Sequence, residues 1–503
     1  MGLKSKIGLC IARGICLIGL LLWAFLLPTG EPQIEQTDAE GGKTAVSQGA
    51  VIEDSGWQDI SSVTEGAVSE AAVSKDTDKK KTGKTSGDKA KSSEEPKQST
   101  SPAGKKNSGT KTKTSKKTSK KGKTTKKTTS SKQTGATQTE QETGQLSTTN
   151  SIHKTVVSDL TITSGEAACE VSGSVATIRK AGTYTLTGTI SDGQIIVDTE
   201  KTSKVTLVCN GMSLNCSKSA PLYIKSADKV TLELVSGTKN SITDGKTYTF
   251  ATAIKEPDAA LYSEDDLTIC GGGTLIVKGQ YQDGIASKND IKIEQGSVQV
   301  SAADDGIRGK DGIEISGGSV NVVCESHALK TTETLDSQKG MIKISGGKVN
   351  LDAVGDGIHA TNQIQVIGGS TYIDAKNDGI DTDSSFLMSG GSLTIDGPKS
   401  ENHAIFACTK GTTVNGGTLF AVGSSAMAKE MGSSSRQKSL FYKYSQEQAA
   451  DTTVKLLNSS DKVLFQHKTT RKYQCVVYSA PDLSSGTYSV YCNSARIAEC
   501  RVD

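Results

Sequence analysis

A three-residue motif recurs through the second half of this 503-residue chain and constrains its fold more than any other feature. Each copy is an Asp or His, then Gly or Ala, then Ile or Leu, and successive copies are separated by 22, 22, 29, 22 and 25 residues. A fixed period near this length is typical of stacked solenoids, in which each repeat forms one coil. The copies are Asp283-Gly284-Ile285, Asp305-Gly306-Ile307, His327-Ala328-Leu329, Asp356-Gly357-Ile358, Asp378-Gly379-Ile380 and His403-Ala404-Ile405.

The residues within one repeat predict three short strands. In residues 283–304, apolar and polar residues alternate in three runs, around Ile285, Ile291 and Val298. Such alternation indicates strands with one buried face, and the Asn, Gly and Asp residues between the runs favour turns. We therefore predict an all-β chain that folds as a right-handed parallel β-helix, with coils of about 22 residues and an antiparallel β cap at the C-terminus.

Composition divides the chain into four regions. Residues 1–30 contain a long apolar run after two lysines, which predicts a signal peptide or membrane anchor and export to the cell surface, either anchored or secreted. Residues 31–150 have too few apolar residues to build a core and are expected to be a disordered linker rich in Lys, Ser and Thr. Residues 151–425 are expected to form the parallel β-helix. Residues 426–503 are expected to form the β cap that covers its open end.

The linker carries most of the positive charge. Residues 79–132 hold nineteen lysines and three acidic residues, a net charge of +16 in a chain whose total is +3. The simplest interpretation is a solvated spacer whose lysines repel one another. The alternative is a spacer that lies along anionic cell-wall polymer. Nucleic acid is not an expected partner, because the run has no aromatic residue and follows an export signal.

Stacking should bring side chains one repeat apart into contact, and this gathers acidic residues into two clusters. Carboxylates packed about 5 Å apart repel one another, and a hard cation resolves the conflict. Calcium prefers oxygen ligands in flexible geometry, and the absence of soft ligands disfavours zinc and copper. The alternative is that each Asp only caps its own turn. The predicted calcium ligands are Asp283, Asp304, Asp305, Asp356, Asn377, Asp378, Asp381 and Asp383.

Other reactive side chains carry no assigned chemistry. His327 and His403 interrupt the column of aspartates, and we interpret them as turn residues or surface contacts rather than catalysts. Most cysteines after the linker are expected to be buried free thiols, although a bridge among Cys475, Cys492 and Cys500 is possible. We assign no catalytic residue.

Several motifs resemble a family of clostridial surface proteins known for carbohydrate binding. They are the triad repeat, residues 180–193 (KAGTYTLTGTISDG), residues 256–263 (EPDAALYS) and residues 479–483 (SAPDL). The resemblance covers about residues 155–503 and leaves out the linker. It implies a right-handed parallel β-helix with bound calcium, and binding of polygalacturonate or cellulose.

The second acidic cluster also resembles the calcium site of the family-nine pectate lyases. Asp356, Asn377-Asp378 and Asp381 match that pattern, with Asn in place of one Asp. The first cluster departs from the pattern, because Arg308 stands where the last Asp is expected. What this resemblance implies is a calcium ion held between neighbouring coils.

We expect a cell-surface protein that binds acidic polysaccharide such as polygalacturonate in a calcium-dependent way. Aromatic residues make up only 4% of the chain, and Tyr372 is one of the few in the repeats, which favours an anionic ligand over cellulose. One alternative is a calcium-dependent polysaccharide lyase, for which Lys376, Lys399 and Arg308 are candidate bases only by proximity. The other alternative is a structural stalk or adhesin stiffened by calcium.

Overall fold

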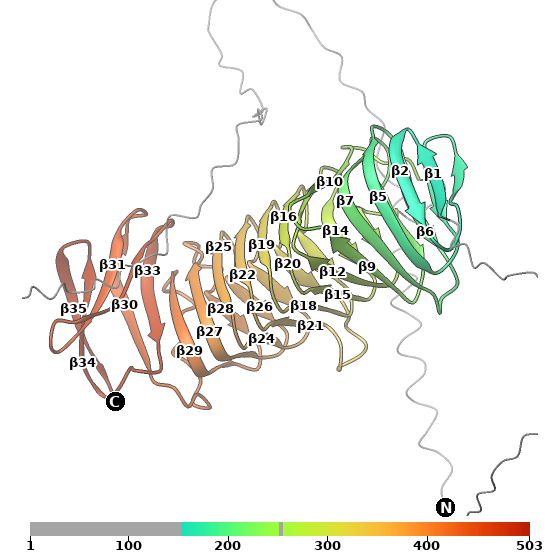
Figure 1. Cartoon of the computed structure of the whole chain (residues 1–503). Coiled ribbons are helices and arrows are strands. Elements are labelled where there is room, and N and C mark those ends of the chain that lie inside the picture. The colour runs from blue at the N-terminus through green and yellow to red at the C-terminus, as the bar shows by residue number, and fades with distance from the viewer. Residues whose placement is uncertain (1–151, 251–254) are drawn as a thin grey trace, which may run out of the picture. The chain divides into compact units, whose positions relative to one another are not determined.

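The computed structural model describes residues 152–250 and 255–503, which form a long stack of β-coils (Figure 1). Every regular element within these residues is a β-strand. No helix long and apolar enough to cross a membrane is found among them. The expected signal or anchor at 1–30 and the linker at 31–150 lie outside the described residues.

Each regular coil consists of three strands, as the alternating pattern predicts. Strands of one coil pair in parallel with those of the next, and the register joins Ile285 to Ile307, Ile291 to Ile313, and Val298 to Val320. The 22-residue repeat is therefore one coil, and the predicted fold class is confirmed. Two successive coils are β14 (Asp283–Ser287), β15 (Asp290–Ile293) and β16 (Ser297–Ala302), followed by β17 (Ile307–Gly309), β18 (Gly312–Ile315) and β19 (Ser319–Cys324).

The coils stack into three faces. Eleven strands form the first face, where β3 is antiparallel to β4 and the other neighbours are parallel. Besides β14 and β17, these strands are β3 (Glu170–Ser172), β4 (Val175–Ile178), β6 (Gln194–Asp198), β8 (Leu222–Ser226), β11 (Ala259–Ser263), β20 (Leu329–Thr331), β23 (Ile358–Ala360), β26 (Ile380–Thr382) and β28 (Phe406–Cys408).

The other two faces belong to one continuous sheet, because several long strands turn the corner between them. The second face adds β9 (Lys229–Leu234), β12 (Asp266–Gly271), β21 (Met341–Ile344) and β24 (Ile364–Val366) to β15 and β18. The third adds β10 (Lys239–Asp244), β13 (Thr274–Gly279), β22 (Lys348–Ala353) and β25 (Ser370–Ala375) to β16 and β19. The corner strands are β5 (Gly182–Ile190), β7 (Lys204–Cys216), β27 (Phe386–Asp396) and β29 (Thr412–Gly423).

The core consists of columns of aliphatic side chains that run along the stack. The third residue of each triad contributes one such column, and Ile285, Ile307, Leu329, Ile358 and Ile380 are all fully buried. Burying an aliphatic side chain of this size stabilises the fold by roughly 1.5–3 kcal/mol. Each column adds further contacts with the residues above and below, so the stack gains stability from its length.

The Gly-Gly pairs form the tight corner between the second and third faces. Gly347 has φ of +78°, and a Cβ atom there would lie 2.6 Å from the carbonyl oxygen of Gly318 in the preceding coil. Both the backbone conformation and the close approach of the next coil therefore require glycine.

The C-terminal part closes the stack with antiparallel strands. β29 pairs antiparallel with β33 (Tyr473–Ser479), which pairs in turn with β30 (Ser439–Gln448). A separate four-stranded antiparallel sheet follows, made of β32 (Val463–Lys468), β31 (Thr453–Asn458), β34 (Gly486–Cys492) and β35 (Ala495–Val502). The edge of the last coil at β29 is thus paired, as expected for a cap, whereas β28 is the end strand of its own sheet.

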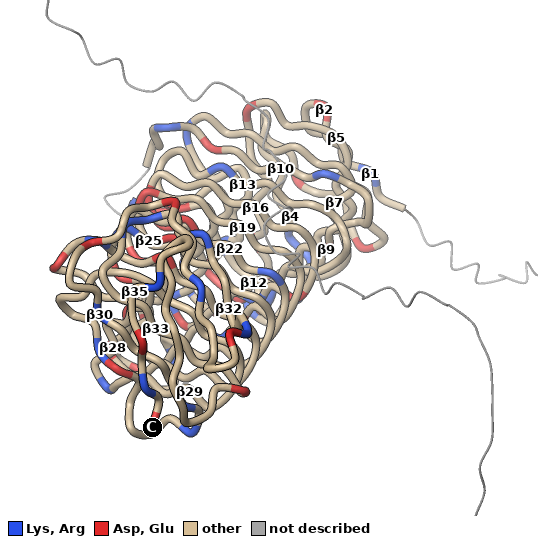
Figure 2. The backbone as a smooth tube through the Cα atoms, turned by 90° about the vertical axis from the view of Figure 1, so that its left-hand side faces the viewer, with Lys and Arg blue, Asp and Glu red and all other residues tan. Residues whose placement is uncertain are grey.

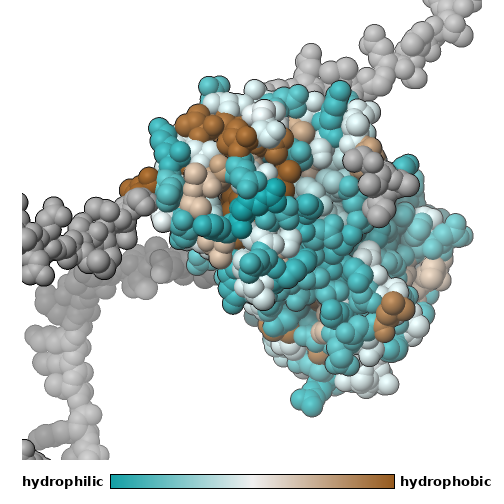
Figure 3. All heavy atoms as spheres, turned by 90° about the vertical axis from the view of Figure 1, so that its right-hand side faces the viewer, coloured by the Kyte–Doolittle hydropathy of each residue, from teal (hydrophilic) through white to brown (hydrophobic). Residues whose placement is uncertain are grey.

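At the other end, an antiparallel hairpin begins the stack. β1 (His153–Val157) pairs with β2 (Asp159–Ser164), which pairs with β5. This end of the molecule is largely hydrophilic, with one group of apolar side chains on its surface (Figure 3).

The nine cysteines in the described part are all free thiols, and five of them are buried. The possible bridge among Cys475, Cys492 and Cys500 therefore does not form here.

Candidate functional site

The first residue of each triad forms a hydrogen-bonded ladder along the edge of the first face. The backbone N–H of Asp305 donates to Oδ1 of Asp283 at 3.1 Å, and that of His327 donates to Oδ1 of Asp305 at 3.1 Å. The same bond joins the N–H of Asp378 to Oδ1 of Asp356 at 2.9 Å. Capping of the turns therefore accounts for one oxygen of each aspartate. The aspartates of the column differ in the partners of their second carboxylate oxygen.

Two of the three carboxylates in the first acidic cluster pair with basic side chains of the protein. Asp283, Asp304 and Asp305 come together, with one oxygen of each within 4.8 Å of the others. However, Arg308 donates to Oδ2 of Asp283, and Nζ of Lys330 lies 2.8 Å from Oδ2 of Asp305. The repulsion that led us to expect a cation is relieved here by Arg308 and Lys330.

Burial has the largest effect on the pKa of Asp283 in this first cluster. The Asp283 side chain is 4% exposed, and burial raises its pKa to about 7, although Arg308 opposes the shift. Arg308 also donates to Oδ1 of Asp258 at 2.7 Å, so its guanidinium joins two buried or half-buried carboxyls. Burial lowers the pKa of Arg308, but the two carboxylates outweigh burial and raise that pKa above its usual value.

The second acidic cluster has no Lys or Arg partner in the described residues. Asp356, Asp378 and Asp381 also bring one oxygen each within 4.8 Å of the others. Asp378 accepts a hydrogen bond from the N–H of Ala404 through Oδ1, and burial raises its pKa. The only basic side chains against these three carboxylates in the described part are histidines, and Nδ1 of His403 lies 3.8 Å from Oδ1 of Asp378.

The two remaining predicted ligands lie at the edge of this cluster. Asn377 is half-buried and directly precedes Asp378, and its N–H donates to the carbonyl of Gly355 at 3.2 Å. Asp383 is exposed on the turn after β26 and lies outside both carboxylate groups.

Two histidines meet at Asp356, and sequence reasoning missed one of them. Nδ1 of His327 lies 3.0 Å from Oδ2 of Asp356, and Nδ1 of His359 lies 3.3 Å from the same oxygen. Nδ1 of His359 is also 2.8 Å from Oδ2 of Asp381. The signal for His359 was present in the strand register, which places Arg308, Lys330, His359 and Asp381 at equivalent positions of successive strands.

The histidines and Asp356 shift each other's protonation. The carboxylates of Asp356 and Asp381 raise the pKa of His359 to about 9, against the effect of burial. Burial raises the pKa of Asp356, but His327 and His359 outweigh burial and hold that pKa well below its usual range. The opposite shifts in the pKa values of His359 and Asp356 both favour an ion pair between the two side chains.

Tyr372 has a structural role rather than a place in an exposed aromatic platform. Its hydroxyl donates to Oδ2 of Asp396 at 2.9 Å, and Asp396 is fully buried. The same carboxylate lies 3.0 Å from Nε2 of His467 and accepts the N–H of Thr470 at 2.9 Å. This network joins β25 and β27 of the stack to the C-terminal sheet.

The surface of the stack carries both signs of charge. Lys and Arg positions are interspersed with Asp and Glu positions along the tube (Figure 2). Many form pairs across neighbouring coils, such as Lys343 with Glu314 at 2.8 Å and Lys339 with Asp311 at 2.6 Å. A cluster of acidic side chains without Lys or Arg partners, such as that at Asp356, stands out against this background.

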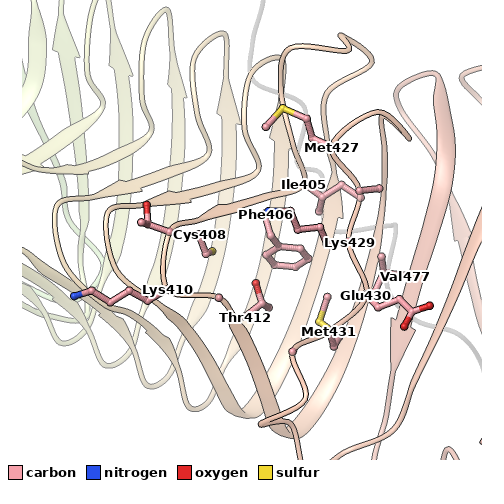
Figure 4. Close-up of a pocket in the computed structure, with 14 residues that line it drawn as sticks. Ile405, Phe406, Cys408, Lys410, Thr412, Met427, Lys429, Glu430, Met431 and Val477 are labelled. Atoms are coloured by element: carbon pink, nitrogen blue, oxygen red, sulfur yellow. The ribbon is translucent and has the colours of Figure 1, made fainter.

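A cavity of about 390 Å³ lies near the C-terminal end of the stack. Strand β28 and the residues after β29 line it, with Phe406, Met427 and Met431 among mostly apolar side chains and with Lys410, Lys429 and Glu430 at its polar positions (Figure 4). Its lining includes none of the predicted calcium ligands.

Comparison with known proteins supports a role in carbohydrate recognition. The family described as "Carbohydrate-binding domain-containing protein" matches residues 172–428, just over half of the chain. A protein of that description from Acetivibrio thermocellus is 45% identical over 126 residues, which are 25% of this chain and 44% of the relative. The match thus spans less than half of that relative's length.

One solved structure also aligns with the chain. It is titled as the structure of the polysaccharide lyase-like protein from C. thermocellum in a gadolinium derivative, and it is 31% identical. The alignment covers 52% of this chain and 95% of that one, with a TM-score of 0.43. From the family match, the chain belongs to the family of carbohydrate-binding domain-containing proteins.

Proposed function

We propose that this protein binds acidic polysaccharide of the polygalacturonate type, and that calcium held by Asp356, Asp378 and Asp381 bridges the protein to the uronate carboxylates. Family membership supports carbohydrate binding. The observation that carries the finer proposal is the meeting of three carboxylates that lack a Lys or Arg partner in the described residues. Calcium accepts six to eight oxygens, so three protein carboxylates leave room for ligand oxygens.

Asn377 is well suited to assist at this site. It directly precedes Asp378 and offers a neutral amide oxygen, a ligand type that calcium accepts alongside carboxylates. Asp383 is close in sequence but exposed on the following turn, and we assign it a peripheral role.

The first cluster is a weaker calcium candidate in this proposal. Asp283, Asp304 and Asp305 offer oxygens, but Arg308 and Lys330 already supply positive charge to two of them. A calcium ion at this cluster would have to displace Arg308 and Lys330, or bind beside them against the repulsion of their positive charges. We therefore assign it a lower calcium affinity than the cluster at Asp378.

A polysaccharide lyase is the second candidate function. It needs a basic residue that accepts a proton beside the metal. Arg308 is unsuitable, because its two carboxylate partners raise a pKa that is already high. Lys376 and Lys399 are exposed and remain the bases to test.

We also propose that the protein is exported and acts at the cell surface, where residues 1–30 anchor or direct it and the lysine-rich linker spans or contacts anionic wall polymer. These regions lie outside the described residues, and the proposal rests on their composition.

The test is a sedimentation assay with insoluble polygalacturonate in calcium or in excess chelator, together with the ultraviolet absorbance of unsaturated product. Retention in calcium without product supports the binding function, and formation of product supports the lyase. A protein that is not retained and forms no product supports a structural stalk. Asp378→Asn removes the charge yet keeps an acceptor for the N–H of Ala404, so it should weaken retention without unfolding the coil. Asp482→Asn, at an exposed position, is the matched control.

A further inference from the structure

We propose that His327, His359, Asp356 and Asp381 form a binding site for a divalent transition metal of the zinc type. The metal-ligating atoms of His327, Asp356 and His359 all lie within 4.8 Å of one another, and Asp381 reaches the same place through the 2.8 Å approach of its Oδ2 to Nδ1 of His359. The chain has five histidines, and two of them converge on one carboxylate.

The orientation of the His359 ring points to a ligand. Nδ1 of His359 is shielded from solvent and makes no hydrogen bond within the described residues, although two carboxylate oxygens are close enough. The oxygens therefore lie off the direction in which an N–H could donate. A buried polar atom without a hydrogen bond is unfavourable, and a metal ion placed between the ring nitrogen and the carboxylates would satisfy it.

The imidazole nitrogens and carboxylate oxygens at this site favour one class of metal. Imidazole nitrogens suit zinc and other first-row transition metals, whereas calcium takes oxygen ligands. Two imidazoles and two carboxylates match the ligand number of a four-coordinate zinc site. The side chains of His327 and His359 are 22% and 29% exposed, so an ion can reach them from solvent.

The column of equivalent positions explains why the neighbouring coils described by the structure do not offer the same donors. The residues that align with His359 in the two preceding coils are Arg308 and Lys330, which form ion pairs with neighbouring aspartates. At His359 the same place is held by an imidazole, a common metal ligand.

This site shares Asp356 and Asp381 with the proposed calcium site but does not depend on it. Zinc binding should require His359 and tolerate loss of Asp378, whereas calcium binding should require Asp378 and tolerate loss of His359. The two proposals can therefore fail separately.

The experiment uses the purified full-length protein without a histidine tag, stripped with chelator and then titrated with Zn²⁺ by calorimetry. Cobalt loading gives a second readout, because Co²⁺ bound by imidazole has a characteristic visible spectrum. We expect one Zn²⁺ per chain, at least ten-fold weaker binding in His359→Gln and in Asp381→Asn, and no change in His403→Gln. Thermal unfolding of the metal-free proteins verifies that each variant is folded.

Three results would overturn the proposal. They are an absence of stoichiometric zinc binding by the folded wild-type protein, zinc binding that His359→Gln leaves intact, and a cobalt spectrum typical of an all-oxygen site. In each case the cluster is only an ion-paired group of histidines and carboxylates.

Discussion

The N–H of Asp378 donates a hydrogen bond to Oδ1 of Asp356, its counterpart in the preceding coil, at 2.9 Å. Because the coils are in register, residues 22 positions apart in sequence become direct neighbours. The same register that allows this hydrogen bond at the turn also brings the acidic side chains together. The structural role of the column and its proposed ligand-binding role are therefore coupled. A variant that tests ligand binding alone must preserve the backbone hydrogen bond.

Loss of Arg308 should destabilise the middle of the stack. Arg308→Met leaves Asp283, which is 4% exposed, without its cationic partner, and it also leaves Asp258 unpaired. Removing one partner of a buried pair costs about 3 kcal/mol or more, so the free energy of unfolding in urea should fall by roughly that amount. Arg496→Met removes an exposed pair with Glu499 and should change stability by less than about 1 kcal/mol. Equal effects for both variants would refute the importance of burial here.

Replacing a glycine at the corner of a coil should destabilise the protein more than replacing a glycine of similar φ that has no atoms close to it. Gly347→Ala places a Cβ atom 2.6 Å from the carbonyl oxygen of Gly318, whereas Gly411→Ala meets no atom within 4 Å. Gly411→Ala should cost about 1 kcal/mol from its positive φ, and Gly347→Ala should cost clearly more because the coils must also separate. Chemical denaturation of the two variants measures the difference. A similar cost for both would mean that the close approach of the coils is unimportant.

The buried Asp396 should hold the C-terminal sheet against the stack. Its oxygens bind Nε2 of His467 and the N–H of Thr470, and His467 and Thr470 together outweigh burial and lower the pKa of Asp396. Asp396→Ala leaves these donors unpaired, so amide hydrogens of β31 and β32 should exchange with solvent faster than in the wild type. Lys472→Ala, which breaks only an exposed pair with Glu447, is the control. Unchanged exchange in Asp396→Ala would show that the sheet is held by apolar contacts alone.

Stability in the presence of chelator should fall as the pH rises from about 6.5 to about 9. The pKa of His359 is raised to about 9 in the folded state, so its protonated form stabilises the fold fully below its unfolded pKa and that contribution is lost through this window. Linkage puts the loss on the order of 2–3 kcal/mol. His359→Gln should flatten the dependence of the urea midpoint on pH in this range. A wild-type midpoint that does not change would contradict the ion pairing of His359 with Asp356 and Asp381.

The sequence predicted the fold because the period, the alternation and the glycine corners all specify one coil. Ile285, Ile307 and the equivalent residues pair as expected, and the region predicted as an antiparallel cap contains β30 and β33. β35 lies within the predicted cap, and its alternation of Ala498, Cys500 and Val502 with the exposed Glu499 and Arg501 fits a strand with one covered face.

The partners of the predicted site residues were harder to predict. Lys330 and His359 lie in three-residue strands, and the alignment of His359 with Lys330 depends on a register that crosses the 29-residue repeat. The role of Tyr372 depends on Thr470, which is 98 residues away, and no local pattern reports such a contact. Apart from Asp383, the sequence thus indicated which acidic residues meet, but not which positive charges accompany them.

The most direct test of the proposed function is a calorimetric titration of the purified protein with polygalacturonate oligosaccharide, in calcium and again in excess chelator. The account predicts binding in calcium that is lost with chelator and weakened at least ten-fold by Asp378→Asn. If the chelated protein keeps its full affinity for the oligosaccharide, the calcium-bridged site at Asp356, Asp378 and Asp381 is wrong.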